Sequence, residues 1–250
     1  MTDDIATNER RAIVLIAMVT VPLAVILAGI GVAAGAVLVG VVIGVGLALV
    51  WSTAAWWAGP ALVLRAIQPR PADPDEHARL HNLVAGLAGS AGVPAPKLYV
   101  LDADAPNALA MGVHPRRSSL VVTSGLLEQL DRIELEGVVA RELVRIRRHD
   151  TTPGTVAVPL LLVLQGVRPL AAYIASTAVG SGHVLAADLG AVALTRYPPG
   201  LAGALAKIRV DGPVTASRTT AHLWFDPPLG GAGHDVHPPL DERIEALREL

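Results

Sequence analysis

Arg141-Glu142-Leu143-Val144-Arg145 lies within a stretch whose apolar residues repeat at helical spacing. The repeat runs from Glu134 to Arg148 and predicts an amphipathic helix, because residues three and four apart share one helix face. The apolar stripe of this helix consists of Leu135, Val138, Val139, Leu143 and Ile146. We therefore expect the helix to pack one face into a core while it carries the charged pentad.

The pentad has the spacing of the helical motif H-E-x-x-H, in which two histidines hold Zn²⁺ and the glutamate acts as general base. Glu142 stands at the glutamate position, but Arg141 and Arg145 stand at the two histidine positions. A guanidinium group offers no lone pair to a metal and stays protonated. The pattern indicates a zinc-peptidase type of helix in which both histidine ligands are replaced.

The composition suits one membrane anchor joined to one compact soluble domain. The chain has 250 residues, of which 52% are apolar and only 17% are charged. Its net charge of −2 gives no reason to expect a nucleic-acid partner, and the absence of cysteine excludes disulfides and thiolate chemistry. Only Lys97 and Lys207 among the 20 basic residues are lysines, a bias typical of a high-GC bacterial genome.

A long apolar segment near the start of the chain predicts two transmembrane helices. No charged residue occurs between Arg11 and Arg65, and about 20 residues suffice for one span. We place the two spans within residues 12–64, near Ala12–Ile30 and Ala36–Trp57. Three tryptophans predict a membrane interface at the end of the second span: Trp51, Trp56 and Trp57.

Basic residues flank this hairpin on both sides. Arg10 and Arg11 precede the first span, and Arg65 and Arg70 follow the second. By the positive-inside rule both flanks face the cytoplasm. We expect residues 1–11 to form a cytoplasmic N-terminus of a multi-pass plasma (inner) membrane protein, with the soluble domain also in the cytoplasm.

A proline-rich linker over residues 65–75 separates the spans from a domain over residues 76–250. We expect an α+β domain, mostly helical, with a small β-sheet beside the pentad helix. The expected strands are 98–101, 107–112 and 120–123, and the expected helices are 76–91, 134–148, 188–194, 201–210 and one that begins at 240.

A second apolar region, at about 151–182, is broken by Arg168-Pro169. We expect a helical hairpin at or in the membrane here. Each half is short for a full span, and buried core helices would give the same pattern.

Several stretches occur in a fixed order around the pentad. They are 91–100, 106–112, 123–127, 134–140, 187–188, 194–201 and 237–240. In this order they resemble the HtpX-like membrane zinc metallopeptidases, part of the gluzincin group that includes the CAAX prenyl protease. The resemblance covers roughly residues 76–250, and the N-terminal apolar pair looks like the anchor of that family.

The resemblance implies which residues would form a zinc site. It places the third ligand, a glutamate, four residues before Asp188, where this chain has Val184. Glu142 and Asp188 match the family's base and a supporting acid, and we interpret both as vestigial. With Arg141, Arg145 and Val184 at the three ligand positions, we expect no zinc and no other cofactor. A base alone supplies about 10²–10⁴ in rate, too little for amide hydrolysis.

The two arginines admit more than one interpretation. They share a helix face and repel each other, so a buried pair would need anionic partners. We favour an ion-pair cluster with Glu142 and Asp188. The alternatives are that both arginines point into solvent from an opened cleft, or that they form an anion or lipid-headgroup site near the membrane.

The resemblance also gives a role to the strand that contains Asn107, Ala108, Leu109 and Ala110. In the family this strand lines the cleft and pairs with the substrate backbone, and an edge strand can capture an extended peptide without any chemistry. The simpler interpretation is an edge strand covered by its own loops.

Two sets of residues are candidates for relocated metal ligands. One consists of His149, His183 and Asp188, and the other of His222, His234 and His237. The spacing of the second set matches no standard zinc pattern.

The leading functional hypothesis is a catalytically inactive membrane pseudopeptidase. It would act as a binding, scaffolding or regulatory subunit of a membrane protein complex, with membrane proteins and the lipid bilayer as partners and no nucleic acid. One alternative is an active membrane zinc metalloendopeptidase with relocated ligands, in membrane-protein quality control as the resemblance implies. Another is an accessory subunit whose spans matter more than its domain.

Overall fold

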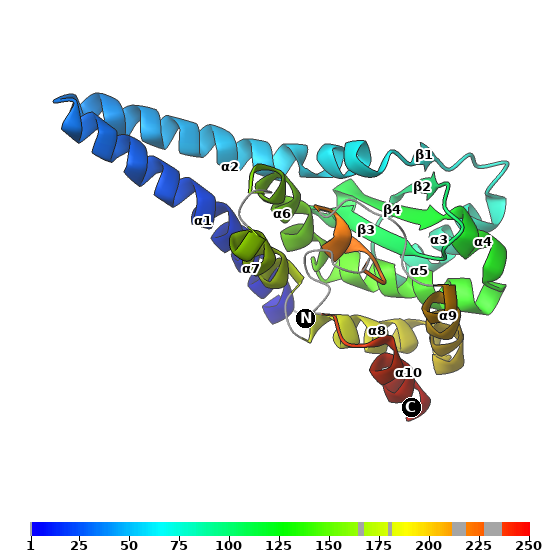
Figure 1. Cartoon of the computed structure of the whole chain (residues 1–250). Coiled ribbons are helices and arrows are strands. Elements are labelled where there is room, and N and C mark those ends of the chain that lie inside the picture. Colours follow the sequence, from blue (N-terminus) through cyan, green and yellow to red (C-terminus); the bar gives the residue numbers. More distant parts are fainter. Residues whose placement is uncertain (1, 165–167, 180–181, 212–218, 228–236) are drawn as a thin grey trace.

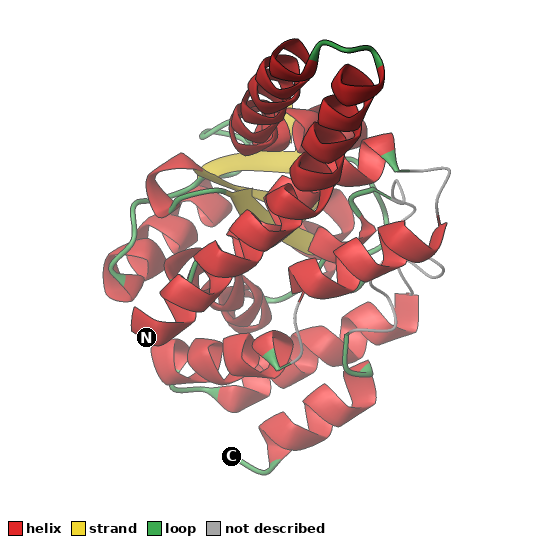
Figure 2. Ribbon diagram, turned by 90° about the vertical axis from the view of Figure 1, so that its left-hand side faces the viewer, coloured by secondary structure: helices red, strands yellow, loops and turns green. Residues whose placement is uncertain are grey.

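The computed structural model describes residues 2–164, 168–179, 182–211, 219–227 and 237–250. Two long helices, α1 (Thr2–Ala33) and α2 (Val37–Ile67), run side by side and project away from the remainder of the molecule (Figures 1 and 2). Both are long and apolar enough to cross a membrane. Their outward side chains are exposed and aliphatic, which is typical of a lipid-facing surface.

Small residues let α1 and α2 approach closely. A Cβ added to Gly40 would lie 2.6 Å from the Cα of Gly31, so the two backbones touch at this point. Such small-residue contacts are typical of helix pairs in membranes, where lipid provides no hydrophobic drive for association. Both helices run beyond the predicted spans: α1 begins earlier, among charged residues, and α2 continues past residue 57 to Ile67, through a stretch whose only charged residue is Arg65.

The sheet has four strands in the order β1-β2-β4-β3. The strands are β1 (Arg70–Pro71), β2 (Lys97–Leu101), β3 (Ala108–Gly112) and β4 (Ser118–Thr123). β2 and β4 are parallel, and the other two pairs are antiparallel. β1 lies in the segment predicted as a linker, where its two residues pair with Tyr99 and Val100 of β2.

Helices make up most of the domain, so the predicted α+β, mostly helical class is confirmed. The remaining helical elements are α3 (Ala78–Ala91), η1 (Pro115–Arg117), α4 (Ser124–Gln129), α5 (Arg132–Arg147), α6 (Thr151–Val163), α7 (Arg168–Val179), α8 (His183–Thr195), α9 (Pro198–Asp211), η2 (Ala221–Leu223) and α10 (Leu240–Arg248).

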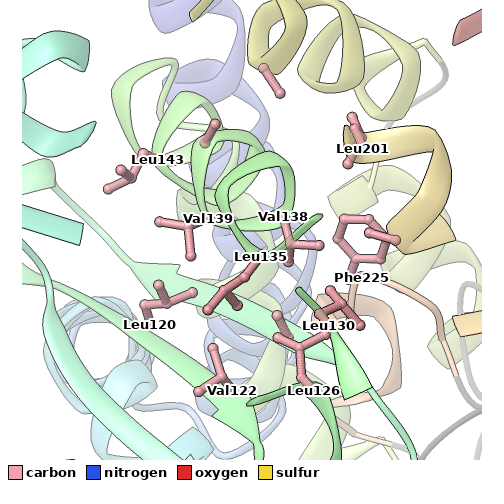
Figure 3. Close-up of a cluster of buried hydrophobic side chains, with 14 of the residues drawn as sticks. Leu120, Val122, Leu126, Leu130, Leu135, Val138, Val139, Leu143, Leu201 and Phe225 are labelled. Atoms are coloured by element: carbon pink, nitrogen blue, oxygen red, sulfur yellow. The ribbon is translucent and has the colours of Figure 1, made fainter. Parts of the chain in front are cut away.

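The pentad helix, α5, is the centre of the domain. Asp131 caps its first turn and Glu134 completes the capping box, so the backbone N–H groups of Asp131, Ile133 and Glu134 are satisfied at its start. The predicted apolar stripe is fully buried against the sheet, α3, α4 and α9 (Figure 3). Gly137 lies where α9 crosses, because a Cβ there would come within 2.8 Å of the backbone of Leu201. Neighbours also cover the opposite side of α5, so Arg141 and Glu142 are buried as well.

The half of the sheet formed by β3 and β4 is buried on both faces. Ala108 and Ala110 of β3 face the core around α5, whereas Leu109 and Met111 face a second cluster formed with α2, α6 and η2. This alternation follows from the two-residue period of a strand. β3 therefore lies directly between the pentad helix and the membrane-proximal part of the chain.

The apolar region predicted as a hairpin contains α6 and α7, which pack against α1 around Leu15 and Ile174. Residues 165–167 between them, and residues 180–181 after α7, lie outside the described residues. The stretch 169–195 also meets the length and hydropathy criteria for a span. We treat α8 as part of the domain, because its Asp188 is fully buried among arginines.

Candidate functional site at the pentad helix

The three positions that the resemblance assigns to zinc ligands do come together. Arg141 and Arg145 on α5 and Val184 on α8 line one small cavity of about 20 Å³, room for a single water. His183, His222 and His237 line the same cavity, together with Asp150. The structure therefore brings these three positions together from two helices that lie far apart in the chain.

Glu142 is held by arginines on both sides. Its Oε1 accepts a hydrogen bond from Arg141 Nη1 at 2.5 Å, and its Oε2 accepts one from Arg145 Nη1 at 2.7 Å. Oε2 also accepts the backbone N–H of Ala110 on β3 at 2.8 Å. The carboxylate is completely buried. Glu142 thus ties its own helix to the edge strand of the sheet.

Asp188 of α8 is the second carboxylate of the site. Its Oδ1 accepts from Arg141 Nε at 2.7 Å, as the ion-pair interpretation requires. Arg243 of α10 donates to both oxygens, from Nε to Oδ2 at 2.7 Å and from Nη2 to Oδ1 at 2.9 Å. Such bidentate pairs are the strongest and most directional ion pairs in proteins.

We call these five residues the arginine–carboxylate cluster: Arg141, Glu142, Arg145, Asp188 and Arg243. It joins α5, α8 and α10 and contains three cations and two anions. The ring of Phe225 completes it, because the guanidinium carbons of Arg141 and Arg243 lie 4.4 and 4.8 Å from the ring centroid. Cation–π contacts of this kind gain strength when the cation is shielded from water.

The charges of the cluster are stabilised by one another. Burial opposes the charged form of Arg141, but the carboxylates of Asp188 and Glu142 outweigh it and raise the Arg141 pKa. Burial likewise opposes ionisation of Asp188, but Arg243 and Arg141 hold its pKa below the usual value. For Arg243 burial dominates and lowers the pKa, although an arginine remains protonated in proteins. The cluster is therefore a set of mutually compensated ions.

The histidines near the site have other partners. His149 lies beside Glu9, with its Nδ1 3.4 Å from Oε1, and its ring meets that of His114. His183 Nδ1 lies 3.0 Å from Asp150 Oδ1, and its Nε2 contacts Arg11 of α1. The structure therefore does not bring His149, His183 and Asp188 together.

The second set of relocated ligands is only partly described. His222 and His237 line the cavity, whereas His234 lies outside the described residues. His222 Nε2 lies 2.9 Å from the carbonyl oxygen of Gly154, and burial lowers the His222 pKa to about 4. Within the described ranges no group of three His, Cys, Asp or Glu residues is arranged to hold a metal ion.

The outer edge of β3 is occupied by the chain itself. Leu109 pairs with Trp224 in an antiparallel bridge, and the N–H of Phe225 donates to the carbonyl of Ala108 at 2.8 Å. Asn107 fastens this segment, because its Nδ2 donates to the carbonyl of Asp226 at 2.7 Å. A peptide at Asn107–Ala110 would have to displace these residues.

Sequence reasoning missed the contribution of Arg243 to the site. The signal was present, because Arg243 shares a face of α10 with Leu247 and borders Ile244, and all three are buried. An arginine on the apolar face of an amphipathic helix needs a buried anion. The role of Phe225 as a platform for two guanidinium groups had no comparable signal.

Comparison with known proteins gives the family of the chain. Residues 74–250 match the sequence model of a protein family that is described as "Peptidase family M48". A "Protease HtpX homolog" of Dictyoglomus thermophilum is 35% identical, with 76% of this chain and 75% of that protein covered. Another, of Caldanaerobacter subterraneus, is 31% identical over 81% and 82% of the two chains. A third, of Limosilactobacillus reuteri, is 31% identical over 98% of both.

Fold, site and matches together define a membrane protein of the metallopeptidase class. More narrowly, the chain belongs to peptidase family M48 and is HtpX-like, as the resemblance implied.

One expectation has to be corrected. We expected no cofactor, but membership of this family and the relatives named as HtpX proteases point to zinc, the metal of HtpX-type peptidases. The error was to judge the cofactor of the whole protein from three side chains.

The pentad itself does not fit a zinc ion as it is arranged. Arg141 and Arg145 are cations without a lone pair, Val184 is aliphatic, and Glu142 already accepts hydrogen bonds at both oxygens. We therefore derive no chemical step through a metal at this position.

Proposed function

We propose that this member of peptidase family M48 is a membrane pseudopeptidase. It would act as a binding, scaffolding or regulatory subunit of a membrane protein complex rather than by cleaving peptides at the pentad. The observation that carries the proposal is the state of Glu142, whose two oxygens accept hydrogen bonds from Arg141, Arg145 and the backbone of Ala110.

Chemistry at this glutamate would need a different arrangement. A general base must lie within hydrogen-bond reach of the water that it activates. Glu142 is fully buried, and both of its oxygens already accept hydrogen bonds from the protein itself. Opening the site would separate a buried carboxylate from two guanidinium groups, at a cost of several kcal/mol.

The proposal includes a location. The hairpin of α1 and α2 would anchor the protein in the plasma (inner) membrane as a multi-pass protein, with its domain in the cytoplasm. The support is the placement of basic residues, because Arg10 and Arg11 precede the apolar part of α1 while Arg65 and Arg70 follow that of α2.

Partner binding along Asn107–Ala110 also remains part of the proposal. An extended segment of a partner would take the place of Leu223–Phe225 beside β3. Trp224 and Phe225 are fully buried, so the exchange would require a partner segment with large apolar side chains of its own.

A second candidate function is an active zinc metalloendopeptidase with relocated ligands, in membrane-protein quality control. The family's zinc favours it, and so does the presence of His183, His222 and His237 around one cavity. Against it, Arg145 lines that cavity and would repel a metal cation.

Crosslinking in native membranes separates the two candidates. The full-length tagged protein and its Glu142→Gln variant are crosslinked, purified and analysed for bound proteins by mass spectrometry. A pseudopeptidase should recover the same intact membrane protein in both cases. Fragments with the wild type that become intact only with Glu142→Gln would identify a substrate and contradict the proposal.

A further inference from the structure

A shallow apolar groove lies on the outward face of α2. Its lining residues are Leu49, Val50, Thr53, Ala54 and Trp57, and the groove has a volume of about 440 Å³. All five side chains are exposed, whereas Ala55, Gly59 and Val63 on the opposite face are buried. The groove therefore opens toward the surroundings of the hairpin.

The shape of the groove follows from side-chain size. Thr53 and Ala54 are short, and they lie between larger side chains at Val50 and Trp57. Val50 and Trp57 are seven residues apart, which is two helical turns or about 10 Å. The lining is almost entirely apolar and follows the helix over this distance, which suits a hydrocarbon chain.

The positively charged side chain of Arg117 lies at the end of this groove that Trp57 forms. The guanidinium carbon of Arg117, in η1, lies 4.1 Å from the centroid of the Trp57 ring. This cation–π contact joins two segments that are sixty residues apart in the sequence, and it fixes the position of a long, flexible side chain. Arg116 lies beside it, and both arginines are exposed.

The surroundings leave this positive charge available. Among the described residues no carboxylate forms an ion pair with Arg116 or Arg117. Tryptophans such as Trp57 favour the boundary between hydrocarbon and headgroups. A phosphate at that level would meet two cations, while an acyl chain of the same molecule would meet the groove.

We propose that the groove on α2 and the pair Arg116–Arg117 together bind one anionic phospholipid. Its acyl chain lies along Val50–Trp57 and its phosphate contacts Arg117. A free phosphate would leave the apolar groove unused, and a zwitterionic lipid would gain less from two cations. Because η1 connects β3 to β4, a bound lipid also fixes this end of the sheet relative to the membrane surface.

The test uses the full chain in nanodiscs of phosphatidylcholine alone or with one fifth phosphatidylglycerol. We expect a higher melting temperature with phosphatidylglycerol, and one such lipid retained in native mass spectrometry. Arg117→Gln should lose both effects. Arg70→Gln, at an exposed arginine paired with Glu76, should lose neither.

Two further arms separate the sources of the phosphate and guard against misfolding. Ala54→Leu fills the groove without changing any charge and should reduce lipid retention, whereas inorganic phosphate in phosphatidylcholine discs should have no effect. Arg117→Lys keeps the charge and should retain part of the stabilisation. Equal melting temperatures in both lipids, or the same gain in Arg117→Gln as in the wild type, would overturn the proposal. An equal effect of free phosphate would do the same.

Discussion

Asp188 is the anion that joins α8 to the other two helices of the arginine–carboxylate cluster. It accepts hydrogen bonds from Arg141 and Arg243, and all three side chains are buried. Asp188→Ala would leave two buried cations without their partner, so we expect a loss of about 3–5 kcal/mol in the free energy of unfolding. Thermal unfolding in detergent should show a melting temperature lower by about 10 °C.

Asp241→Ala is the matched control for this substitution. Asp241 also pairs with an arginine, Arg209, but both side chains are largely exposed. Exposed pairs contribute little, so its melting temperature should stay close to that of the wild type. Equal effects of the two substitutions would show that the cluster is not buried as described.

His222 makes stability depend on pH. Burial lowers its pKa to about 4, with Arg145 adding to the effect, whereas in the unfolded chain the pKa is near the ordinary 6.5. Between these values only the unfolded state takes up the proton, so stability falls as the pH drops from 6.5 toward 4. The loss should be about 3 kcal/mol. His222→Gln keeps a donor for Gly154 and should flatten this part of the stability profile. An unchanged profile would rule out His222 as the source.

At the scale of elements, the contact of α1 with α2 depends on glycine at position 40. A Cβ there would lie 2.6 Å from the Cα of Gly31, whereas a Cβ on Gly29 or Gly46 would meet nothing within 4 Å. Gly40→Ala should therefore cost about 1–3 kcal/mol through overpacking. Gly29→Ala and Gly46→Ala should be neutral or slightly stabilising. The test is to measure the melting temperatures of the three variants in one detergent. If Gly40→Ala does not have the lowest melting temperature of the three, the close contact is contradicted.

The segment Leu223–Phe225 should open when Asn107 is removed. Asn107 holds the backbone of Asp226, beyond the bridge between Leu109 and Trp224. Asn107→Ala removes two hydrogen bonds to the backbone of Asp226. It should increase hydrogen exchange at the amide of Phe225 by about tenfold or more, and a tenfold increase corresponds to about 1.4 kcal/mol. Asn82→Ala, on the exposed face of α3, serves as control. Unaltered protection in Asn107→Ala would mean that the buried aromatic rings alone hold the segment.

The elements of the domain could be predicted where local signals were strong. The apolar stripe predicted α5 from Glu134 to Arg148, within two residues of its start and one of its end. β1 was missed because a two-residue strand containing Pro71 carries no periodicity and exists only through its pairing with β2. The close approach of Trp224 to Leu109 joins residues far apart in the chain and has no local signature.

At the scale of the whole molecule, the family resemblance implied that three positions would lie close together. Arg141, Arg145 and Val184 line one cavity, although α6 and α7 separate α5 from α8 in the chain. The partner of Asp188 on α10 could not be predicted, because it depends on how the C-terminal helix returns to the core. The expectation of no cofactor was also wrong at this scale. Family membership points to zinc, whereas the expectation considered only Arg141, Arg145 and Val184.

The central claim is that Glu142 is a structural anion and does not act as a base. It is tested most directly by peptide cleavage, measured with added zinc for the wild type and for Glu142→Gln, per amount of folded protein. The triple variant Arg141→His, Arg145→His, Val184→Glu, which restores the three matched ligand types, serves as the positive control. We predict the same background cleavage for the wild type and Glu142→Gln. Cleavage by the wild type that Glu142→Gln abolishes would contradict the account.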